Sequence, residues 1–337
     1  MRNKVINTIK RYNLIQSGDK VVLGVSGGPD SISMLNILNE IKEEWQFEIY
    51  VAHINHMIRK EANDDEKYVQ QYCEKNNIQC FVKRVNVQEI ANIQKIGTEE
   101  AGRNIRYEFF EEVLQKVGAN KIAIAHNKND KIETIVMNLL RGSGLSGLKG
   151  IEPIREQRII RPLIECERQE IEQYCEQYKL EPRIDKTNFE NDYTRNKIRN
   201  IVIPYIKNEF NPNIIETMDR LSQVATEESN YIELQVEKIY QKLLIERSQK
   251  QIILKLKEFN QQEKVIKNRL ILLVVRELMG STQRIEKVHI EDIIKLCSNN
   301  VGNKFLTPNK NIKFLVKDKR IYVTSLWVTK SISHNVN

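Results

Sequence analysis

The residues whose types and spacing point most directly to a chemistry form a glycine-rich turn near the amino terminus. Residues 21–31 read VVLGVSGGPDS, an apolar run followed by small residues and the start of a helical pattern. Because glycine adopts backbone conformations that a side chain forbids, successive N–H groups of this turn can point at one anion. The positive end of the helix that begins near Asp30 attracts the same charge. We therefore predict a phosphate-binding loop, formed by Ser26, Gly27, Gly28, Pro29, Asp30 and Ser31.

Two side chains of this loop suit a nucleotide that carries a magnesium ion. The Ser31 hydroxyl can reach a phosphate oxygen, and the Asp30 carboxylate can bind Mg²⁺. The loop contains neither the GxxxxGK(S/T) pattern of a Walker A motif nor the GxGxxG pattern of a dinucleotide site. The alternative is a plain strand-to-helix turn that Asp30 caps.

Polar side chains also gather where the second apolar run ends, in the segment HINHMIR at 53–59. Alternation along a strand places His53 and Asn55 on one side of it. His56 then falls at the carboxyl end of the strand, where ligands bind in open α/β sheets. A single histidine here would more often be structural, but the cluster favours a binding role.

An acidic pair follows the fourth apolar run. Asp130 and Glu133 are three residues apart, so they lie one turn apart at the start of a helix, and His126 precedes them. Two carboxylates in this position can hold a magnesium ion and attract a cationic amine. The alternative is that they simply cap the helix and favour its dipole.

Two pairs of arginines have helical spacing. Arg103 and Arg106 are three residues apart, and Arg195 and Arg199 are four apart, so each pair shares a helix face. Such pairs can grip phosphate groups or steady a nucleotide base. For the first pair, the alternative is a solvated face that pairs with nearby glutamates.

The elements that must position these residues alternate along 20–160. Strands separated by helices of this length indicate a parallel sheet with helices on both faces and right-handed crossovers. Apolar runs rich in valine and isoleucine predict strands at 20–25, 47–54, 79–85 and 121–125. Helical periodicity predicts helices at 30–43, 61–77, 99–117 and 129–141.

The character of the chain changes after about residue 211. Long helical patterns cover 213–245, 260–279 and 285–297, with a short strand at 251–256. The last residues predict two or three strands with a turn at 307–310. We therefore divide the chain into a domain at 1–210 that carries the candidate site, a mostly helical domain at 211–300 that binds a nucleic acid or serves as a linker, and a small basic part at 301–337.

The charge of the chain concentrates at its carboxyl end. From residue 303 onward, seven basic residues and one acidic residue give +6 of the net +8. This asymmetry points to a polyanionic partner, because lysine and arginine release counterions when they bind phosphates. The alternative is a solvated lysine face. The basic residues are Lys304, Lys310, Lys313, Lys317, Lys319, Arg320 and Lys330.

Composition excludes several classes of protein. The first residues carry charges throughout, which is unlike a signal peptide, and no apolar run approaches the roughly 18 residues that span a bilayer. The five cysteines form no CxxC pair, which argues against a disulfide framework, a zinc ribbon or an iron–sulfur site. We therefore expect a cytoplasmic protein with reduced thiols and no membrane partner.

The motifs resemble those of a known family. The loop at 26–31 resembles that of the PP-loop ATPases, and seven segments across about 20–205 are similar, in order, to the tRNA(Ile)-lysidine synthetases. The family's usual form A-H-H-x-D-D-x-x-E-T appears here as AHNKNDKIET at 125–134, so Asn127 and Asn129 replace a histidine and an aspartate. The other segments are 53–59, 100–109, 161–163 (RPL), 185–188 (DKTN) and 195–199 (RNKIR).

The resemblance implies a function. ATP and Mg²⁺ are the expected cofactors, and the family activates the wobble cytidine of a CAU-anticodon isoleucine tRNA as an adenylylated base. L-lysine then attacks C2 and releases AMP. A tRNA thiolase with the same loop and a non-catalytic tRNA- or nucleotide-binding relative are the alternatives, and a homodimer is left open.

The same resemblance implies roles for individual residues. The implied catalytic residues are Asp30, Asp130, Glu133 and Arg199, with Asp30 and Asp130 as ligands of Mg²⁺. ATP would contact the loop at 26–31 and His53. The implied contacts of lysine and tRNA are Asn55, His56, Arg103, Arg106, His126, Asp130, Glu133, Arg141, Arg195 and Arg199.

Overall fold

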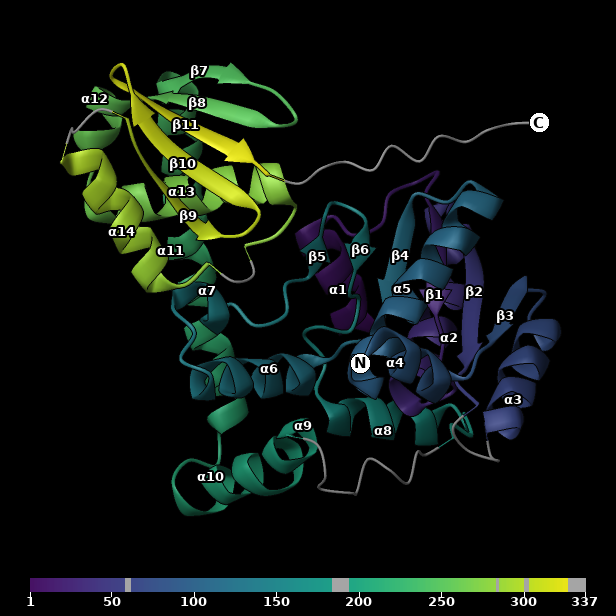
Figure 1. Ribbon diagram of the computed structural model, residues 1–337. Coiled ribbons are helices and arrows are strands. Elements are labelled where there is room, and N and C mark those ends of the chain that lie inside the picture. Colours follow the sequence, from purple (N-terminus) through teal and green to yellow (C-terminus); the bar gives the residue numbers. More distant parts are fainter. Residues whose placement is uncertain (58–61, 184–193, 283–284, 300–302, 327–337) are drawn as a thin grey trace, which may run out of the picture. The chain divides into compact units, whose positions relative to one another are not determined.

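The computed structural model forms two compact units, Met1–Thr226 and Glu227–Asn337 (Figure 1). The boundary between them falls inside the long helix α11 (Ile214–Leu243). The division into three domains with a boundary at 210 therefore stays a prediction. The structure describes residues 1–57, 62–183, 194–282, 285–299 and 303–326. Outside these ranges lie four predicted motif residues and one predicted basic residue, namely Arg59, Asp185, Thr187, Asn188 and Lys330.

Among the described residues, a six-stranded sheet forms the centre of the first unit, with strand order β3-β2-β1-β4-β6-β5. Neighbouring strands run parallel from β3 to β6, and β5 pairs antiparallel with β6. The parallel strands confirm the predicted sheet. The prediction holds because valine- and isoleucine-rich runs suit strands that are buried on both faces. The strands are β1 (Lys20–Gly24), β2 (Glu48–Asn55), β3 (Cys80–Arg84), β4 (Lys121–Ile124), β5 (Ile154–Arg155) and β6 (Ile159–Ile160).

Helices cover both faces of this sheet, as the alternating pattern predicts. On one face, Val21 and Leu23 of β1 share a core with α1, α2, α3 and α8. On the other face, Val22 packs with α5, against which α4 lies. These helices are α1 (Arg2–Tyr12), α2 (Pro29–Trp45), α3 (Ala62–Lys75), α4 (Val87–Gln94), α5 (Thr98–Val117) and α8 (Arg168–Gln177).

A glycine brings α5 close to the end of β1. A Cβ atom added at Gly24 would lie 2.3 Å from the Cζ atom of the buried Phe110 ring. This distance is far below van der Waals contact, so the ring occupies the space that any larger residue would need. The close approach of α5 to the end of β1 therefore depends on a glycine at position 24.

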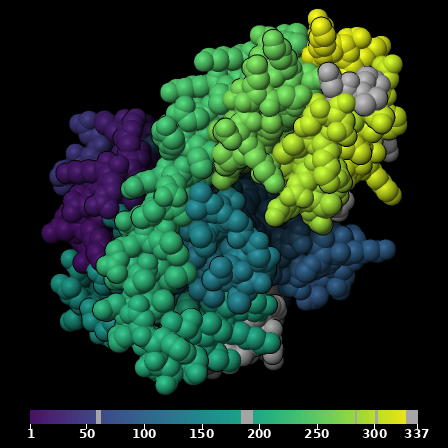
Figure 2. Space-filling model, turned by 90° about the vertical axis from the view of Figure 1, so that its left-hand side faces the viewer, coloured from purple at the N-terminus to yellow at the C-terminus, as the bar shows by residue number. Residues whose placement is uncertain are grey.

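The remaining helices of the first unit follow the sheet strands in the chain. α6 (Lys128–Leu140) starts directly after β4, and α10 (Ile203–Glu209) lies at the surface, where its Tyr205 is exposed (Figure 2, green spheres at the bottom). A largely buried ion pair joins α6 to the start of α11, with Lys131 Nζ 2.8 Å from Asp219 Oδ1. Short elements complete the unit: α7 (Leu145–Leu148), α9 (Thr194–Lys197) and the π-helical turn η2 (Ile198–Val202).

The described part of the second unit contains a five-stranded antiparallel sheet of order β7-β8-β11-β10-β9. Helices pack on one face of it, and the carboxyl half of α11 belongs to the same core. The strands are β7 (Leu244–Arg247), β8 (Gln251–Lys255), β9 (Lys304–Asn309), β10 (Ile312–Lys317) and β11 (Arg320–Ser325). The helices are α12 (Leu256–Asn260), α13 (Lys264–Met279) and α14 (Lys287–Ser298).

One turn in this unit differs from the prediction. The sequence TPNK at 307–310 predicts a turn, but β9 continues to Asn309 and the chain turns at Lys310 and Asn311. Pro308 is tolerated in β9 because this strand lies at the edge of the sheet, where a missing N–H costs no ladder hydrogen bond. None of the described helices is both long enough and apolar enough to cross a membrane.

Candidate active site

The predicted phosphate loop connects β1 to α2. Gly27 has φ +94°, a conformation that an L-residue rarely adopts, and Pro29 begins the helix. The N–H groups of Ser26 and Gly27 both point at the Ser31 hydroxyl oxygen, at 3.2 Å each. The loop thus aims backbone donors at one place in front of a helix N-terminus, which is the arrangement that binds a phosphate.

Asp30, in the first turn of α2, faces the start of α6. Its carboxylate oxygen Oδ1 accepts a hydrogen bond of 2.8 Å from Nδ2 of Asn127. Burial and the nearby charge of Asp130 raise the pKa of Asp30 to about 6, although the Asn127 hydrogen bond works against that rise. Asp30 therefore lies in a place where an ionised carboxylate lacks a full countercharge.

Asn127 and Asp130 form the capping box of α6. Asn127 Oδ1 accepts from the backbone N–H of Asp130 at 2.9 Å, and the backbone N–H of Asn127 donates to Asp130 Oδ2 at 3.1 Å. Asn127 is fully buried and Glu133 is 1% exposed. Asp130 and Asn127 therefore each provide half of the helix cap, and the metal- and amine-binding roles of Asp130 stay predictions.

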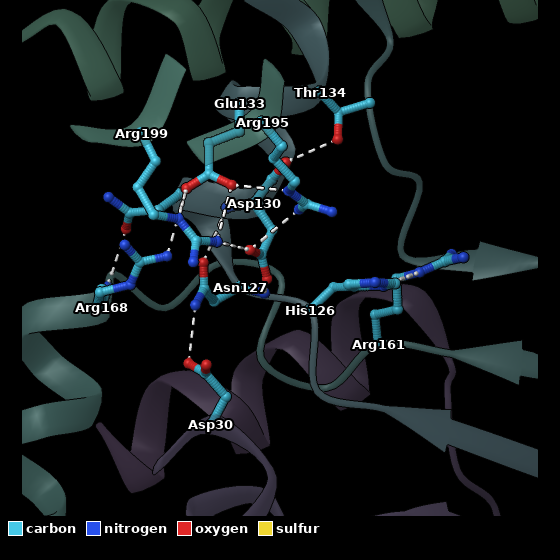
Figure 3. Close-up of polar contacts among 11 residues, drawn as sticks. Asp30, His126, Asn127, Asp130, Glu133, Thr134, Arg161, Arg168, Arg195 and Arg199 are labelled. Atoms are coloured by element: carbon cyan, nitrogen blue, oxygen red, sulfur yellow. Dashed lines mark hydrogen bonds and ion pairs between the residues drawn. The ribbon is translucent and has the colours of Figure 1, made fainter. Parts of the chain in front are cut away.

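Arginines surround the acidic pair (Figure 3). Arg199 approaches Glu133 side-on, with its Nε 2.7 Å from Oε1 and its Nη2 2.9 Å from Oε2. Arg195 places its Nε 2.9 Å from Glu133 Oε2, and both arginines place an Nη2 3.1 Å from Asp130 Oδ1. The predicted arginine pair does share one face, and that face meets the carboxylates.

A third arginine was missed by the sequence reasoning. Arg168, the first residue of α8, places its Nη2 3.3 Å from Glu133 Oε1. Its backbone N–H donates to Asn129 Oδ1 at 2.9 Å, so Asn129 fixes the start of α8 beside the acidic pair. No local pattern marks Arg168, because the contact joins residues far apart in the chain.

His126 lies in a positively charged environment. Its Nδ1 accepts a hydrogen bond of 3.2 Å from Nε of the buried Arg161. Burial, followed by the charges of Arg161 and Arg195, lowers the pKa of His126 to about 3. The imidazole is therefore neutral at physiological pH, and it serves as an acceptor. The charges of Arg106 and Arg103 on α5 act on it in the same direction.

The cluster at the end of β2 is largely engaged in structural contacts. His53 donates from Nδ1 to the backbone oxygen of Val25 at 2.8 Å, and burial lowers its pKa. Asn55 donates to Glu66 Oε2 at 3.0 Å, and Glu66 also holds Arg84 through two hydrogen bonds. Contacts of this cluster with ATP or lysine stay predictions.

Two other predicted residues lie apart from the ionic network. His56 follows β2 on the side of α5, where a Cβ atom added at Gly102 would come 3.9 Å from its ring. Arg141 follows the last residue of α6 and is exposed, whereas the acidic pair lies in the first turns of that helix. The structure therefore does not bring Arg141 to the carboxylates.

The residues present fit a magnesium ion at Asp30. No group of three or more His, Cys, Asp or Glu side chains that could hold a metal occurs among the described residues. Mg²⁺ needs no such cage, because it binds through one or two carboxylates and keeps waters and phosphate oxygens as its other ligands. The raised pKa of Asp30, caused by burial and by Asp130, shows an unbalanced negative charge that a cation would relieve.

Four basic residues of the second unit lie on the outer face of its sheet or at the turn between β10 and β11. Along β10, Ile312, Phe314 and Val316 are buried, so the alternate residues point away from the core. Lys313 is opposite Thr324 and its Nζ lies 4.2 Å from the centre of the Phe305 ring. The exposed residues at the β10–β11 turn add three further charges, from Lys317, Lys319 and Arg320.

Comparisons with known proteins agree with this geometry. Residues 1–206 match a protein family described as "PP-loop domain". A tRNA(Ile)-lysidine synthase of Clostridioides difficile is 45% identical over 96% of this chain and 70% of its own length. One of Clostridium acetobutylicum is 48% identical over 92% of this chain and 67% of its own length, so the chain spans about two thirds of these relatives.

A solved structure shows the same fold. The U34-tRNA thiolase NcsA from Methanococcus maripaludis, with its [4Fe-4S] cluster, has a TM-score of 0.54 and 21% identity, over 66% of this chain and 77% of that chain. At this identity the likeness concerns the fold alone. The family match and the identity with the clostridial relatives lead to one conclusion: the chain belongs to the tRNA(Ile)-lysidine synthase family and carries its PP-loop domain.

Proposed function

We propose that this protein ligates L-lysine to C2 of the wobble cytidine of tRNA(Ile) with anticodon CAU, converting ATP to AMP and diphosphate. One observation carries the proposal. The phosphate loop and the acidic pair of α6 are joined through Asn127, so the side chains that suit a nucleotide and an amine lie in one network. The family to which the chain belongs is named for this reaction.

In the first step, the loop binds the β- and γ-phosphates of ATP through the amides of Ser26 and Gly27. The O2 atom of the cytidine attacks the α-phosphorus, the bond to the β-phosphate oxygen breaks, and diphosphate leaves. Asp30, with Asp130, would hold Mg²⁺, which neutralises charge on the leaving diphosphate. The loop keeps the diphosphate in line with the attacked phosphorus, which is the positioning that phosphoryl transfers need.

In the second step, the side-chain amine of lysine attacks C2. A bond from nitrogen to C2 forms, the bond from C2 to the AMP oxygen breaks, and AMP leaves. The amine has a reference pKa of about 10.4, so it arrives protonated and must lose a proton before it attacks. Asp130 or Glu133 would first bind the ammonium and then accept that proton.

The arginines give this amine site a special property. Every oxygen of Glu133 and Asp130 accepts a hydrogen bond, and guanidinium groups supply most of them. An incoming ammonium therefore has to replace a guanidinium contact. A released arginine could then turn to a phosphate of the tRNA or of the nucleotide, because guanidinium groups bind both anions in the same planar fashion.

The positively charged surfaces would hold the tRNA. Arg103 and Arg106 are exposed on α5 of the first unit, and four further cations lie on the outer face of the second unit's sheet or at its β10–β11 turn. Contacts of this kind fix register on the phosphate backbone and carry no sequence information. The target base must leave its stack to reach the loop. The cytoplasmic location and a homodimer stay predictions.

Neither alternative function has a specific observation in its favour. All five cysteines are free thiols and four of them are buried; Cys73 and Cys80 lie next to each other, but both pack in the core of the first unit rather than at its surface. The non-catalytic alternative has only Asn127 and Asn129 in its support. Both asparagines make hydrogen bonds within the acidic site: Asn127 donates to Asp30, and Asn129 accepts from the backbone N–H of Arg168.

The test is a reaction with ATP, labelled lysine and an unmodified tRNA(Ile) transcript that carries the CAU anticodon. We expect lysine-dependent AMP release and label in the tRNA, with neither product from a transcript whose wobble cytidine is replaced by uridine. An Asp30→Ala variant should lose AMP release and still bind tRNA. Absence of AMP under every lysine and RNA condition would favour the binding-module alternative, and sulfur transfer from cysteine would favour the thiolase.

A further inference from the structure

The Asn127 side chain connects two parts of the candidate site through hydrogen bonds. Asn127 occupies the place of a histidine in the family's usual sequence pattern, and it is fully buried. Its Nδ2 donates to Asp30 Oδ1 at 2.8 Å, and its Oδ1 accepts from the Asp130 N–H at 2.9 Å. One side chain therefore joins the first turn of α2 to the first turn of α6.

The link needs a side chain that accepts a hydrogen bond at one end and donates one at the other. The α6 side presents a backbone N–H, so the amide oxygen has to face it, and the NH₂ group then faces the Asp30 carboxylate. Serine can cap a helix but is too short to reach across to Asp30, and aspartate can cap but has no hydrogen to donate. Among the described residues, no other side chain or N–H group donates a hydrogen bond to the Asp30 carboxylate.

We propose that Asn127 is a positioning residue for the nucleotide-activation step. It holds the Asp30 carboxylate in one orientation and ties it to the helix that carries Asp130 and Glu133. The acidic group of the phosphate loop and the amine-binding pair are then kept at a fixed separation. This inference rests on the proposed function and deepens it, because it identifies what couples the two halves of the site.

The central variant is Asn127→Ser, which keeps the helix cap and removes the link to Asp30. We expect kcat for AMP release to fall about 10- to 100-fold, the range seen when partners that orient metal-binding side chains are lost. The Mg²⁺ concentration for half-maximal binding of ATP, followed by calorimetry without tRNA, should rise. The KM for lysine and the affinity for tRNA should stay within about threefold of the wild type, since neither contact involves the lost NH₂ group.

Two further substitutions at the same position separate orientation from general damage. Asn127→Asp keeps the cap but places an additional carboxylate next to Asp30, so it should impair kcat and Mg²⁺-dependent ATP binding more than serine does. Asn127→His can accept at one ring nitrogen and donate at the other, so it should recover kcat to within about tenfold of the wild type.

The chain offers a matched control. Asn86 caps α4 by accepting from the Glu89 N–H at 3.2 Å, and Asn86→Ser makes the same chemical change away from the site. This control should leave kcat and Mg²⁺-dependent ATP binding unchanged. Normal kcat and Mg²⁺ response in Asn127→Ser, or a folded Asn127→His without recovery, would overturn the inference. If the wild type itself makes no lysidine, the proposed function fails instead.

Discussion

The guanidinium of Arg199 and the carboxylate of Glu133 lie side by side in a two-bond contact, with Nε 2.7 Å from Oε1 and Nη2 2.9 Å from Oε2. Burial opposes the charge of Arg199, yet its hydrogen bond with Glu133 and the charges of Glu133 and Asp130 keep its pKa above the ordinary value. A planar fork matches a carboxylate in a way that an ammonium cannot. The contact therefore fixes the orientation of the Glu133 carboxylate in the candidate site.

Replacing Arg199 by lysine tests this geometry. The charge is kept, but one of the two parallel hydrogen bonds is lost, and Glu133 is 1% exposed, so water cannot replace it. We expect the free energy of unfolding in urea to fall by about 2 kcal/mol, the value typical of a hydrogen bond to a charged group. Lys264→Gln breaks an exposed 3.8 Å ion pair with Glu291 and should leave the unfolding midpoint unchanged. Equal behaviour of the two variants would contradict the prediction.

The sequence predicts the parts of this site that depend on neighbours in the chain. The phosphate loop, the strands β1 to β4 and the shared face of Arg195 and Arg199 all follow from local spacing, and the structure has each of them. The two-residue strands β5 and β6 are too short to leave a periodic pattern. The sequence also could not reveal which groups meet across the fold.

Two contacts illustrate what local spacing leaves out. Asp30 and Asn127 are 97 residues apart, and Asp130 and Arg199 are 69 apart. Spacing alone allowed the arginines to face phosphates and the carboxylates to face an amine. Only the packing of α6 against η2 shows that, in this state, they face each other.

The raised pKa of Asp30 predicts a stability that falls as the pH rises. Burial and Asp130 move this pKa from 3.8 to about 6, so between these values the folded protein holds a proton that the unfolded chain has lost. Ionisation of Asp30 therefore lowers the free energy of unfolding by about 3 kcal/mol at pH 8, and this loss disappears below about pH 4. Asp30→Asn, in Mg²⁺-free buffer, should be more stable than the wild type at pH 8 by about this amount and equal to it at pH 4.

Urea unfolding of both proteins at the two pH values measures this difference. The same variant should release no AMP, since an amide cannot replace the carboxylate as a ligand of Mg²⁺. A stability difference that is the same at both pH values would show that the Asp30 charge does not cause it.

The lowered pKa of His126 predicts the opposite dependence. Burial and the arginines around it lower this pKa from 6.5 to about 3. Between pH 3 and pH 6.5, His126 is therefore protonated in the unfolded chain but neutral in the folded protein. This residue therefore removes stability as the pH falls below about 6.5. His126→Gln keeps an acceptor for Arg161 and does not titrate. The difference in free energy of unfolding between this variant and the wild type should therefore shift by about 2 kcal/mol in favour of the variant when the pH is lowered from 8 to 5. Unfolding curves at pH 5 and pH 8 check this, and a constant offset would contradict it.

The close approach of Phe110 to Gly24 predicts a pair of substitutions that compensate. Gly24→Ala places a methyl group 2.3 Å from the ring, so the free energy of unfolding should fall by about 1–3 kcal/mol, as for other overpacked cores. Adding Phe110→Leu removes the clashing atoms, so the double variant should lose less than the sum of the two single changes. Gly97→Ala is the control, because nothing lies within 4 Å of its added Cβ. Strict additivity would show that the two residues do not clash.

The four cations on the outer side of the second unit's sheet predict a tRNA affinity that depends on salt concentration. Neutralising these cations, through glutamine at Lys313, Lys317, Lys319 and Arg320, leaves the buried face of β10 untouched. Because each lost phosphate contact lowers the slope of log affinity against log salt by about one, tRNA binding should weaken and its slope should fall by up to about four. The matched control removes four exposed lysines of the first unit, Lys10, Lys67, Lys75 and Lys116. It changes the net charge equally, so an effect of charge alone would appear in both variants. An unchanged slope in the first variant would mean that these cations are merely solvated and that the tRNA is held elsewhere.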